Sequence, residues 1–468
     1  MNIRKMDHKP LKTNENKTRP AIILSIGLVL FIGLVWMLVV RFEGENPSLE
    51  FTPLSFISTS QPISLTIADE KSGLRQVWIG LLKDGKESIL FDKHYPKGSL
   101  FRGGLTRKDP IDLQVEPKKL DISDGQAMLR IVIKDYSWKS WGKGNTTYKE
   151  IPVAIDTQPP EVEILTSAHN INQGGAGLVI YRLSENSPRH GVSLNGNFFP
   201  GHTGHFKNNL VAMAFIALDI ELPDQTEMFV TASDMAGNSA RAEFLYYLRK
   251  QSFKSDAVQL TDGFLNSKMP ELMIDVPVDS ETSMIEKFLK VNRELRQENH
   301  KEFSKIGETT DHALYWSTEF MRLPRSSPEA GFADVRDYHY QGQKIDRQTH
   351  LGIDLASLAH SPVPAANRGK VAFVGTIGIY GKTVAIDHGF GIFSTYSHLS
   401  GHNVEKGQMV EKGGIIGRTG TTGMAGGDHL HFGILIHNRF VNPIEWWDPH
   451  WIKDNIQDKI ETTTSLYP

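Results

Sequence analysis

Five residues in the last third of the chain have the types and spacing of a metal-dependent hydrolytic site. They are His350, Asp354, His398, His429 and His431. A histidine and an aspartate four residues apart, completed by one histidine from a distant strand, would offer a divalent metal three protein ligands and leave one tetrahedral position for water. That arrangement is typical of catalytic rather than structural zinc, and it leaves two histidines for acid and base chemistry.

The pair His429 and His431 is expected to lie on a strand. Side chains two residues apart on a strand point to the same face, so one imidazole could bind the metal while the other faces the water. The chain has no cysteine, so a metal must be held by histidine or carboxylate groups. It also has no His-Glu-x-x-His sequence, so a general base must come from elsewhere than that motif.

Short motifs around these residues follow one another between about residues 322 and 448. They are His350-Leu-Gly-Ile-Asp354, Val384-Ala-Ile-Asp-His-Gly389, Tyr396-Ser-His398-Leu399, Val410-Glu-Lys-Gly-Gly-Ile-Ile-Gly417 and His429-Leu-His431-Phe432. In type and order they resemble the zinc peptidases of the LytM type, peptidase family M23, which hydrolyse peptide bonds in the bacterial cell wall. Two departures, Asp428 where a proline is common and a loose Phe332–Arg336 stretch, concern substrate preference more than the metal site.

The resemblance implies a role for each of the five residues. His350, Asp354 and His431 correspond to the zinc ligands, and His398 and His429 correspond to the catalytic pair. One of the pair would accept a proton from water and the other would stabilise the oxyanion. The sequence leaves open which histidine does which. The implied fold is an antiparallel β domain, expected here over residues 322–450, and the implied substrate is a peptidoglycan peptide.

The segment that carries the motifs has the pattern of a glycine-rich antiparallel sheet. Residues 371–374, 383–386 and 392–396 are predicted as consecutive strands, and the last of these leads to His398. Seven glycines between residues 413 and 427 permit tight turns and close backbone approach, so an extended peptide could lie there. The domain is expected to be followed by a C-terminal tail, residues 451–468.

Residues 251–321, just before this domain, are predicted to form a helical insert. Ser283-x-x-Glu286 has the form of a capping box, and apolar residues recur at helical intervals from there to about residue 304. A shorter helix is expected after Thr261-Asp262. The insert could simply pack against the peptidase domain, or it could cover the cleft, because a tethered segment acts at high effective concentration.

Residues 50–158 and 159–250 are predicted to form two β domains. Short alternating runs such as Ile63–Ile67 and Leu129–Ile133 are separated by turn sequences such as Asp84-Gly85. No helical period of useful length interrupts the first of these segments.

The two β segments share a weak internal repeat. Gln158-Pro159-Pro160 indicates a boundary between them, because paired prolines stop a strand. Asp135 in the first segment and Asp234 in the second each precede a glycine-containing loop and a final strand. This pattern resembles bacterial immunoglobulin-like β-sandwich domains, and a spacer or scaffold role is expected for both.

The N-terminal forty residues have the composition of a membrane anchor. Residues 1–20 form a basic leader, and residues 21–40 contain no charge. At about 1.5 Å per residue, such a helix spans a hydrocarbon core of roughly 30 Å. Positive charges before the span predict a cytoplasmic N-terminus and a periplasmic catalytic domain on a single-pass inner-membrane protein. A cleaved signal peptide fits less well, because the apolar run is long and lacks a small-residue cleavage site.

The composition is that of a folded chain with several domains. With 468 residues and 39% hydrophobic content, three or four domains are expected. The formal net charge of -3 shows no basic excess, so no nucleic-acid partner is expected. The expected fold class is mainly β, with a transmembrane helix, two immunoglobulin-like sandwich domains, a short helical insert and a C-terminal antiparallel-β peptidase domain.

The function expected from this organisation is zinc-dependent hydrolysis of peptide crosslinks in peptidoglycan during cell-wall remodelling, with Zn2+ as cofactor. The alternative is a non-catalytic LytM-type regulator that binds and activates another cell-wall hydrolase. Ligand positions tend to be lost in such relatives, whereas all five persist here. A structural adhesin would fit residues 50–250 but would leave the histidines unexplained. The sequence leaves the protein partners open.

Overall fold

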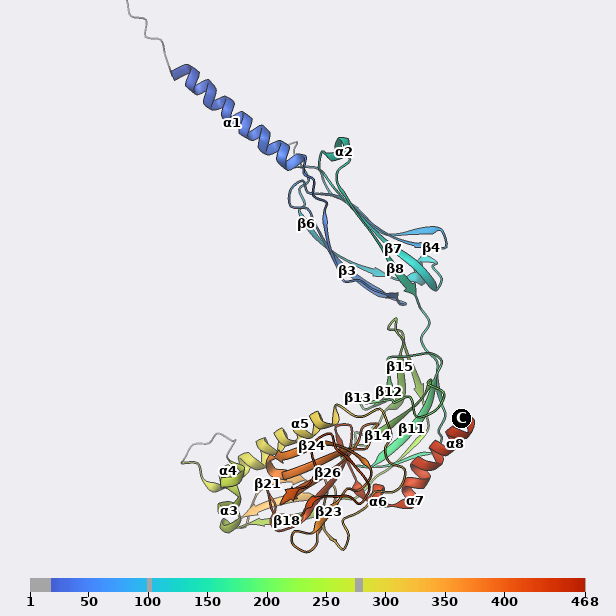
Figure 1. The fold of residues 1–468 in the computed structure, drawn as a ribbon, viewed down its shortest axis with the longest axis vertical. Helices are drawn as coiled ribbons and strands as arrows, with labels where there is room; N and C mark the ends of the chain where they lie inside the picture. Colours follow the sequence, from blue (N-terminus) through green and yellow to red (C-terminus); the bar gives the residue numbers. More distant parts are fainter. Residues whose placement is uncertain (1–17, 99–102, 274–280, 468) are drawn as a thin grey trace, which may run out of the picture. The chain divides into compact units, whose positions relative to one another are not determined.

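The chain is mainly β, as the sequence predicts. A computed structural model describes residues 18–98, 103–273 and 281–467. Strands make up 43% of it and helices 20%. The chain divides into two compact units, Met1–Gln158 and Pro159–Pro468, drawn as ribbons in Figure 1. The division falls at the paired prolines of the sequence.

An apolar helix lies at the N-terminal end of the first unit. Helix α1 (Thr18–Arg41) contains the whole predicted span, residues 21–40, and its segment Ile22–Val39 is long and apolar enough to cross a membrane. None of this segment is buried inside the protein. A signal sequence would pass the same test of length and composition. Of the predicted basic leader, residues 1–17 lie outside the described residues.

The first unit is built from two sheets. The three-stranded sheet contains β1 (Ser48–Phe51), β3 (Gln61–Ala68) and β6 (Lys108–Val115). The five-stranded sheet contains, in spatial order, β2 (Phe56–Ile57), β8 (Thr146–Ile155), β7 (Gly125–Asp135), β4 (Leu74–Lys83) and β5 (Lys86–His94). The connections include two short helices, η1 (Pro117–Leu120) and α2 (Lys139–Gly142).

Alternating side chains explain why these two sheets enclose one core. Ile63, Leu65 and Ile67 of β3 are buried while the residues between them are more exposed, and β7 alternates in the same way. Strands β4 and β5 are joined by the predicted Asp84-Gly85 turn, where both residues have positive φ (49° and 78°). Two sheets around one core agree with the sandwich class, and the immunoglobulin-like strand order stays a prediction.

The sequence repeat between the β segments has a counterpart in hydrogen bonds. Asp135 accepts hydrogen bonds from the backbone N–H and the side-chain amide of Asn145, at 2.7 and 2.8 Å. In the second unit, Asp234 accepts the equivalent pair from Asn238, both at 2.9 Å. The same aspartate–asparagine contact therefore closes the loop before β8 in the first segment and before β16 (Ser239–Glu243) in the second.

The second unit begins with three sheets formed by residues 162–249. They contain β14 (Val211–Ala217), β11 (Ala176–Leu183) and β9 (Val162–Ile164); β13 (Asn197–Pro200), β12 (Arg189–Leu194), β15 (Met228–Ser233) and β16 (Ser239–Glu243); and the parallel pair β10 (His169–Asn172) and β17 (Tyr246–Arg249). Every residue of β14 is buried, and so are all but one of β11. These strands are therefore covered on both faces.

A large antiparallel sheet occupies the C-terminal half of the second unit. In spatial order it contains β19 (Ser327–Ala330), β22 (Ile353–Ala356), β30 (Leu430–Ile436), β26 (Ile392–Leu399), β25 (Gly381–Asp387), β24 (Gly369–Ile377) and β28 (Met409–Val410), with β31 (Arg439–Val441) paired to β30. A smaller sheet contains β23 (Pro362–Pro364), β29 (Ile415–Arg418) and β27 (Gly401–His402), and η3 (Gly378–Tyr380) follows β24. The three predicted strands lie in β24, β25 and β26, which are neighbours.

The predicted helical insert contains a strand as well as helices. Its elements are β18 (Ser255–Leu260), α3 (Asp262–Leu272), α4 (Met284–Lys290), the π-helical turn η2 (Val291–Leu295) and α5 (Arg296–Gly307). Both predicted helix starts are confirmed, because Thr261 caps α3 and Ser283 forms a capping box with Glu286. Strand β18 was not predicted, because it pairs in parallel with β20 (Val335–Tyr340), which lies far along the chain and also pairs with β21 (Gln343–Thr349).

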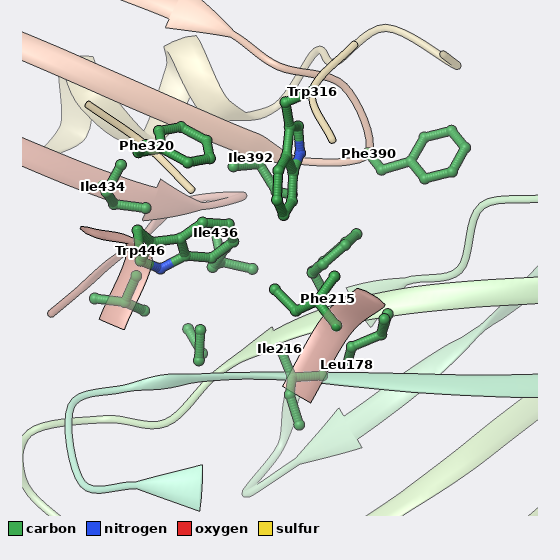
Figure 2. Packing of buried hydrophobic residues seen from close by; sticks show 14 of the residues in the cluster. Leu178, Phe215, Ile216, Trp316, Phe320, Phe390, Ile392, Ile434, Ile436 and Trp446 are labelled. Carbon is green, nitrogen blue, oxygen red and sulfur yellow. The ribbon is translucent and has the colours of Figure 1, made fainter. Parts of the chain in front are cut away.

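One apolar core joins the sheets of residues 162–249 to the large sheet. Figure 2 shows Phe215 of β14 beside Trp316 and Trp446, with ring centroids 6.4 and 6.5 Å away. The two tryptophan rings lie 5.4 Å from each other. The predicted boundaries at residues 250 and 321 therefore do not separate independent cores.

The predicted C-terminal tail is a packed helical end. The predicted tail, residues 451–468, begins inside α7 (Pro449–Ile452), which follows α6 (Pro443–Trp447), and contains the π-helical turn η4 (Lys453–Gln457) and α8 (Asp458–Leu466). Ile452 and Ile456, four residues apart, are buried on one face. Lys459 Nζ donates to the carbonyl of Leu178 in β11 (3.0 Å). This packing was not predicted, because a few apolar residues at the end of a chain do not show which strand they will cover.

Replacing Glu445 with glutamine is expected to remove part of the pH dependence of stability between pH 4.5 and 7. The Glu445 carboxyl is buried and accepts hydrogen bonds from the Asn172 side chain (2.7 Å) and the Ala176 N–H (2.8 Å). Burial raises its pKa from 4.5 to about 7. Between these pH values the folded chain keeps a proton that the unfolded chain releases, so stability falls as pH rises, by about 3 kcal/mol in total.

Calorimetric melting from pH 4.5 to 8 measures this difference. The Glu445→Gln variant should lose part of the pH dependence between 4.5 and 7, whereas Glu405→Gln, at an exposed position, should melt like the parent chain. Equal pH dependence in the Glu445→Gln variant and the parent would contradict the raised pKa.

Candidate active site

Three of the five predicted residues meet at one point of the large sheet. Asp354 in β22 lies directly opposite His431 in β30, and His350 lies three residues before β22. Their facing atoms, His350 Nε2, Asp354 Oδ1 and His431 Nδ1, lie 2.9 to 3.0 Å from one another. All three side chains are buried. The structure therefore brings together three candidate metal-ligand atoms from residues that are up to 81 positions apart in the sequence.

Neighbouring polar groups orient two of these three atoms. His350 Nδ1 donates to the carbonyl of Gly331 (2.8 Å), so the neutral ring presents an unprotonated Nε2 to the other two residues. Arg336 Nη2 donates to Asp354 Oδ2 (2.6 Å), which leaves Oδ1 facing the imidazoles. The site is thus shaped by its surroundings before any ligand binds.

His398 and His429 lie beside this group. Their rings are 4.8 Å apart, and His429 Nε2 lies 3.5 Å from Asp354 Oδ1. His398 Nδ1 donates to the carbonyl of Thr422 (2.9 Å) and His429 Nδ1 to that of Gly427 (2.8 Å). When the rings are neutral, the proton-accepting atom of each is therefore Nε2.

The backbone of His398 has an unusual conformation. Its φ of 61° lies in the left-handed region, which residues with a Cβ rarely adopt. The residue sits near the end of β26 and is held there by the bond from its ring to Thr422. Such conformations occur preferentially at functional sites, where the surrounding fold imposes them.

Burial and the aspartate charge set the protonation of the group. Burial lowers the pKa of His398 well below its ordinary value, and it lowers the pKa of His431 to about 4. Burial acts in the same direction on His429, but the hydrogen bond and charge of Asp354 outweigh it and raise its pKa. Burial would raise the pKa of Asp354, but the adjacent imidazoles, His350 above all, hold it well below the usual range. The aspartate is therefore a carboxylate, while His398 and His431 are neutral.

The donor set fits a divalent metal of the zinc type. His350 Nε2 and Asp354 Oδ1 are both acceptors, and they face the same nitrogen of His431 at hydrogen-bond distance. One hydrogen on His431 cannot satisfy both acceptors fully, and the other ring nitrogen of His431 is buried with no hydrogen-bond partner among the described residues. Two imidazoles and one carboxylate are a ligand set found in catalytic zinc sites.

Comparison with known proteins places this segment in a family. Residues 348–443 match the sequence model of a family described as Peptidase family M23. This segment is a peptidase family M23 domain. The match contains all five predicted residues and ends before the helices α7 and α8.

Relatives of the M23 domain include curated and solved proteins. The chain is 40% identical over 95 residues to DD-carboxypeptidase/endopeptidase Mpg of Neisseria meningitidis, a stretch that covers 20% of this chain and 22% of that protein. The catalytic domain of lysostaphin from Staphylococcus simulans is 26% identical, with 28% of this chain and 98% of that chain covered, at a TM-score of 0.25. A zinc-containing peptidase from Vibrio cholerae is 12% identical, with 94% and 98% covered, at a TM-score of 0.26. The chain thus spans about a fifth of the curated relative's length.

The cavity at the site of the M23 domain is small and includes residues that the sequence did not predict. Its volume is about 120 Å³, and all five predicted residues line it. Arg296 from α5, Arg336 and Tyr380 also line it. Arg336 belongs to the Phe332–Arg336 stretch and could have been found there, whereas no local pattern connects Arg296 or Tyr380 with the site. A larger hollow of about 810 Å³ beside α5 contains none of the five.

Proposed function

We propose that this chain is a zinc-dependent endopeptidase that hydrolyses peptide crosslinks of bacterial peptidoglycan in cell-wall remodelling. The observation that carries the proposal is the convergence of His350 Nε2, Asp354 Oδ1 and His431 Nδ1, with two further histidines beside them. The M23 match supports the reaction class, and the relative described as a DD-carboxypeptidase/endopeptidase supports the substrate class.

Each residue of the site has a proposed role in the reaction. Zinc held by His350, Asp354 and His431 would polarise the scissile carbonyl as a Lewis acid. His398 and His429 both present Nε2 to the site, because carbonyl groups bind their Nδ1 atoms. One of them accepts a proton from the attacking water, and the other donates a hydrogen bond to the developing oxyanion. Arg336 keeps the Asp354 carboxylate turned toward the histidines.

We also propose that the site acts outside the cytoplasm. Helix α1 would span the inner membrane once, and the basic residues before it would keep the N-terminus in the cytoplasm. The M23 domain would then lie in the periplasm, where peptidoglycan is found. The exposed apolar surface of α1 supports this arrangement, because in water it would have no partner.

Alanine at His398 or at His429 is expected to lower turnover while zinc is retained. Neither residue belongs to the proposed ligand set, and loss of a proton-transfer or oxyanion group typically reduces turnover by about 10²-fold or more. The measurement is digestion of purified, defined crosslinked muropeptides followed by mass spectrometry, with zinc content determined on the same samples.

The test includes a control variant and a result that would favour the regulator. His450→Ala, at an exposed position in α7, should leave turnover unchanged. Parental turnover in either catalytic variant would exclude that histidine from the mechanism. A parent chain that cleaves no crosslink but stimulates a separate wall hydrolase would instead identify a regulator.

A further inference from the structure

The C-terminal end of α1 is fixed to the first β unit. Arg41, the last residue of α1, is buried, and its carbonyl accepts a hydrogen bond from the Trp138 N–H (2.6 Å). Its guanidinium lies 5.0 Å above the Trp138 ring, and the Phe42 ring packs edge-on to that ring at 5.5 Å. The helix and the β unit therefore meet at a packed joint and not at a loose linker.

Three exposed apolar side chains belong to the segments that meet at this joint, and we call them the apolar ring: Phe42, Leu105 and Trp141. They are 57%, 63% and fully exposed, respectively. Leu105 is two residues from Gly103, whose backbone lies so close to Arg41 that a Cβ there would be 2.3 Å from Nη1. Trp141 is three residues from Trp138, within about 10 Å of it along the chain. Three separate segments thus place apolar groups around the end of one helix.

The loop that carries Trp141 is held in place, while the ring of Trp141 points away from the protein. Ser140 and Trp141 both have left-handed backbone angles (φ of 54° and 59°), which residues with a Cβ rarely adopt. Arg75 Nη1 donates to the carbonyls of Gly142 and Lys143 (both 3.2 Å). A strained backbone that is anchored on both sides of an exposed tryptophan indicates a binding function for the ring.

The position of the apolar ring selects a lipid bilayer as its partner. If α1 crosses a membrane, the membrane–water interface lies where the apolar segment ends, at Val39, two residues before Arg41. Figure 1 shows α2, which carries Trp141, beside that end of α1. Tryptophan prefers this interface, because its ring is apolar and its N–H is polar. Lys139 and Lys143, both exposed, flank Trp141 and can reach lipid phosphates.

We propose that Phe42, Leu105 and Trp141 insert into the interfacial layer of the outer leaflet, so that the first β unit is seated on the membrane. This inference rests on the proposed membrane span of α1. A seated unit would act as a stiff spacer, because Asn145 donates to the Glu43 carbonyl beside the joint and β8 starts at the next residue, Thr146, and continues for ten residues. At about 3.3 Å per residue, β8 carries the chain roughly 30 Å away from the joint before the exit at Gln158.

Fluorescence of single labelled positions tests this contact in the full chain. The sequence has no cysteine, so Trp141→Cys and Leu105→Cys can each carry one environment-sensitive NBD label. Ile89→Cys is the matched control, because Ile89 is similarly exposed (60%) but lies on β5 opposite Gly80, away from the joint. The vesicles contain phosphatidylethanolamine and phosphatidylglycerol, with and without a nitroxide-labelled lipid.

We expect blue-shifted emission and several-fold stronger nitroxide quenching at positions 141 and 105 than at 89, with iodide in the water quenching position 89 more. Equal quenching at all three positions would overturn the proposal, as would a response of position 141 to soluble glycan strands but not to lipid. Alkaline extraction of the chain from the vesicles would overturn it too, by removing the span on which it rests. Muropeptide digestion by the same samples reports separately on the proposed hydrolase function.

Discussion

A chain with alanine in place of His431 is expected to lose both bound zinc and measurable hydrolysis of crosslinked muropeptides. His431 would supply one of three protein donors, opposite Asp354 in the sheet. Loss of a group that only supports a ligand typically costs about 10–100-fold in metal affinity, so loss of a ligand itself should cost more. Elemental analysis after dialysis measures the metal, and mass spectrometry of digested muropeptides measures the activity.

Controls separate the loss of a ligand from the loss of the fold. His402→Ala changes an exposed histidine of the same domain and should keep both zinc and activity. Circular dichroism of the His431→Ala variant should match that of the parent, because the removed side chain lies at the small cavity. Near-stoichiometric zinc in a folded His431→Ala variant would show that the ligand assignment is wrong.

A chain that starts at residue 322 is expected not to fold, whereas one that starts at residue 159 is expected to fold. The helices before residue 322 bury Phe288, Val291, Leu295 and Phe303 in a cluster that also contains Ile377, Tyr380 and Phe393 of the M23 domain. Burial of one such side chain is worth about 1.5–3 kcal/mol. Four of them are worth roughly 6–12 kcal/mol, which approaches the whole stability of an ordinary domain, about 5–15 kcal/mol.

A chain that starts near residue 258 is also expected not to fold, for two other reasons. It cuts β18, which pairs with β20 from Ser255 to Leu260. It also removes Phe215 and the rest of β14, which cover Trp316 and Trp446. Soluble yield, thermal melting and zinc content of the three truncated chains measure these effects. A folded, zinc-binding chain from residue 322 would show that the insert is dispensable, and higher activity in that chain would support a cover.

The hypothesis that the insert covers the cleft needs a test that leaves the core intact. On α3, Lys268 donates to the Thr421 carbonyl, and Glu271 accepts from the Gly423 N–H, in the loop that precedes His429. A cover predicts that the double variant Lys268→Ala/Glu271→Ala has higher turnover than the parent. Lys301→Ala, exposed on α5, is the control. Unchanged turnover in the double variant would assign the insert to folding alone.

Features set by neighbouring residues could be predicted from the sequence. The capping box at Ser283, the hairpin at Asp84-Gly85 and the apolar helix depend on residues a few positions apart. The M23 domain could also be predicted, because its motifs are short and their order is characteristic. The five site residues belong to those motifs, so they could be named before their geometry was known.

Contacts between distant segments were decided only by the tertiary structure. The continuous apolar run of β14 is compatible with burial on both faces, but nothing local shows that one face covers Trp316 and Trp446. The same holds for Arg296, which reaches the cavity from the insert, and for Tyr380, which also lines it. The physical reason is that the free energy selecting such partners comes from apolar surface and polar groups buried between segments, and these surfaces meet only when the chain has folded.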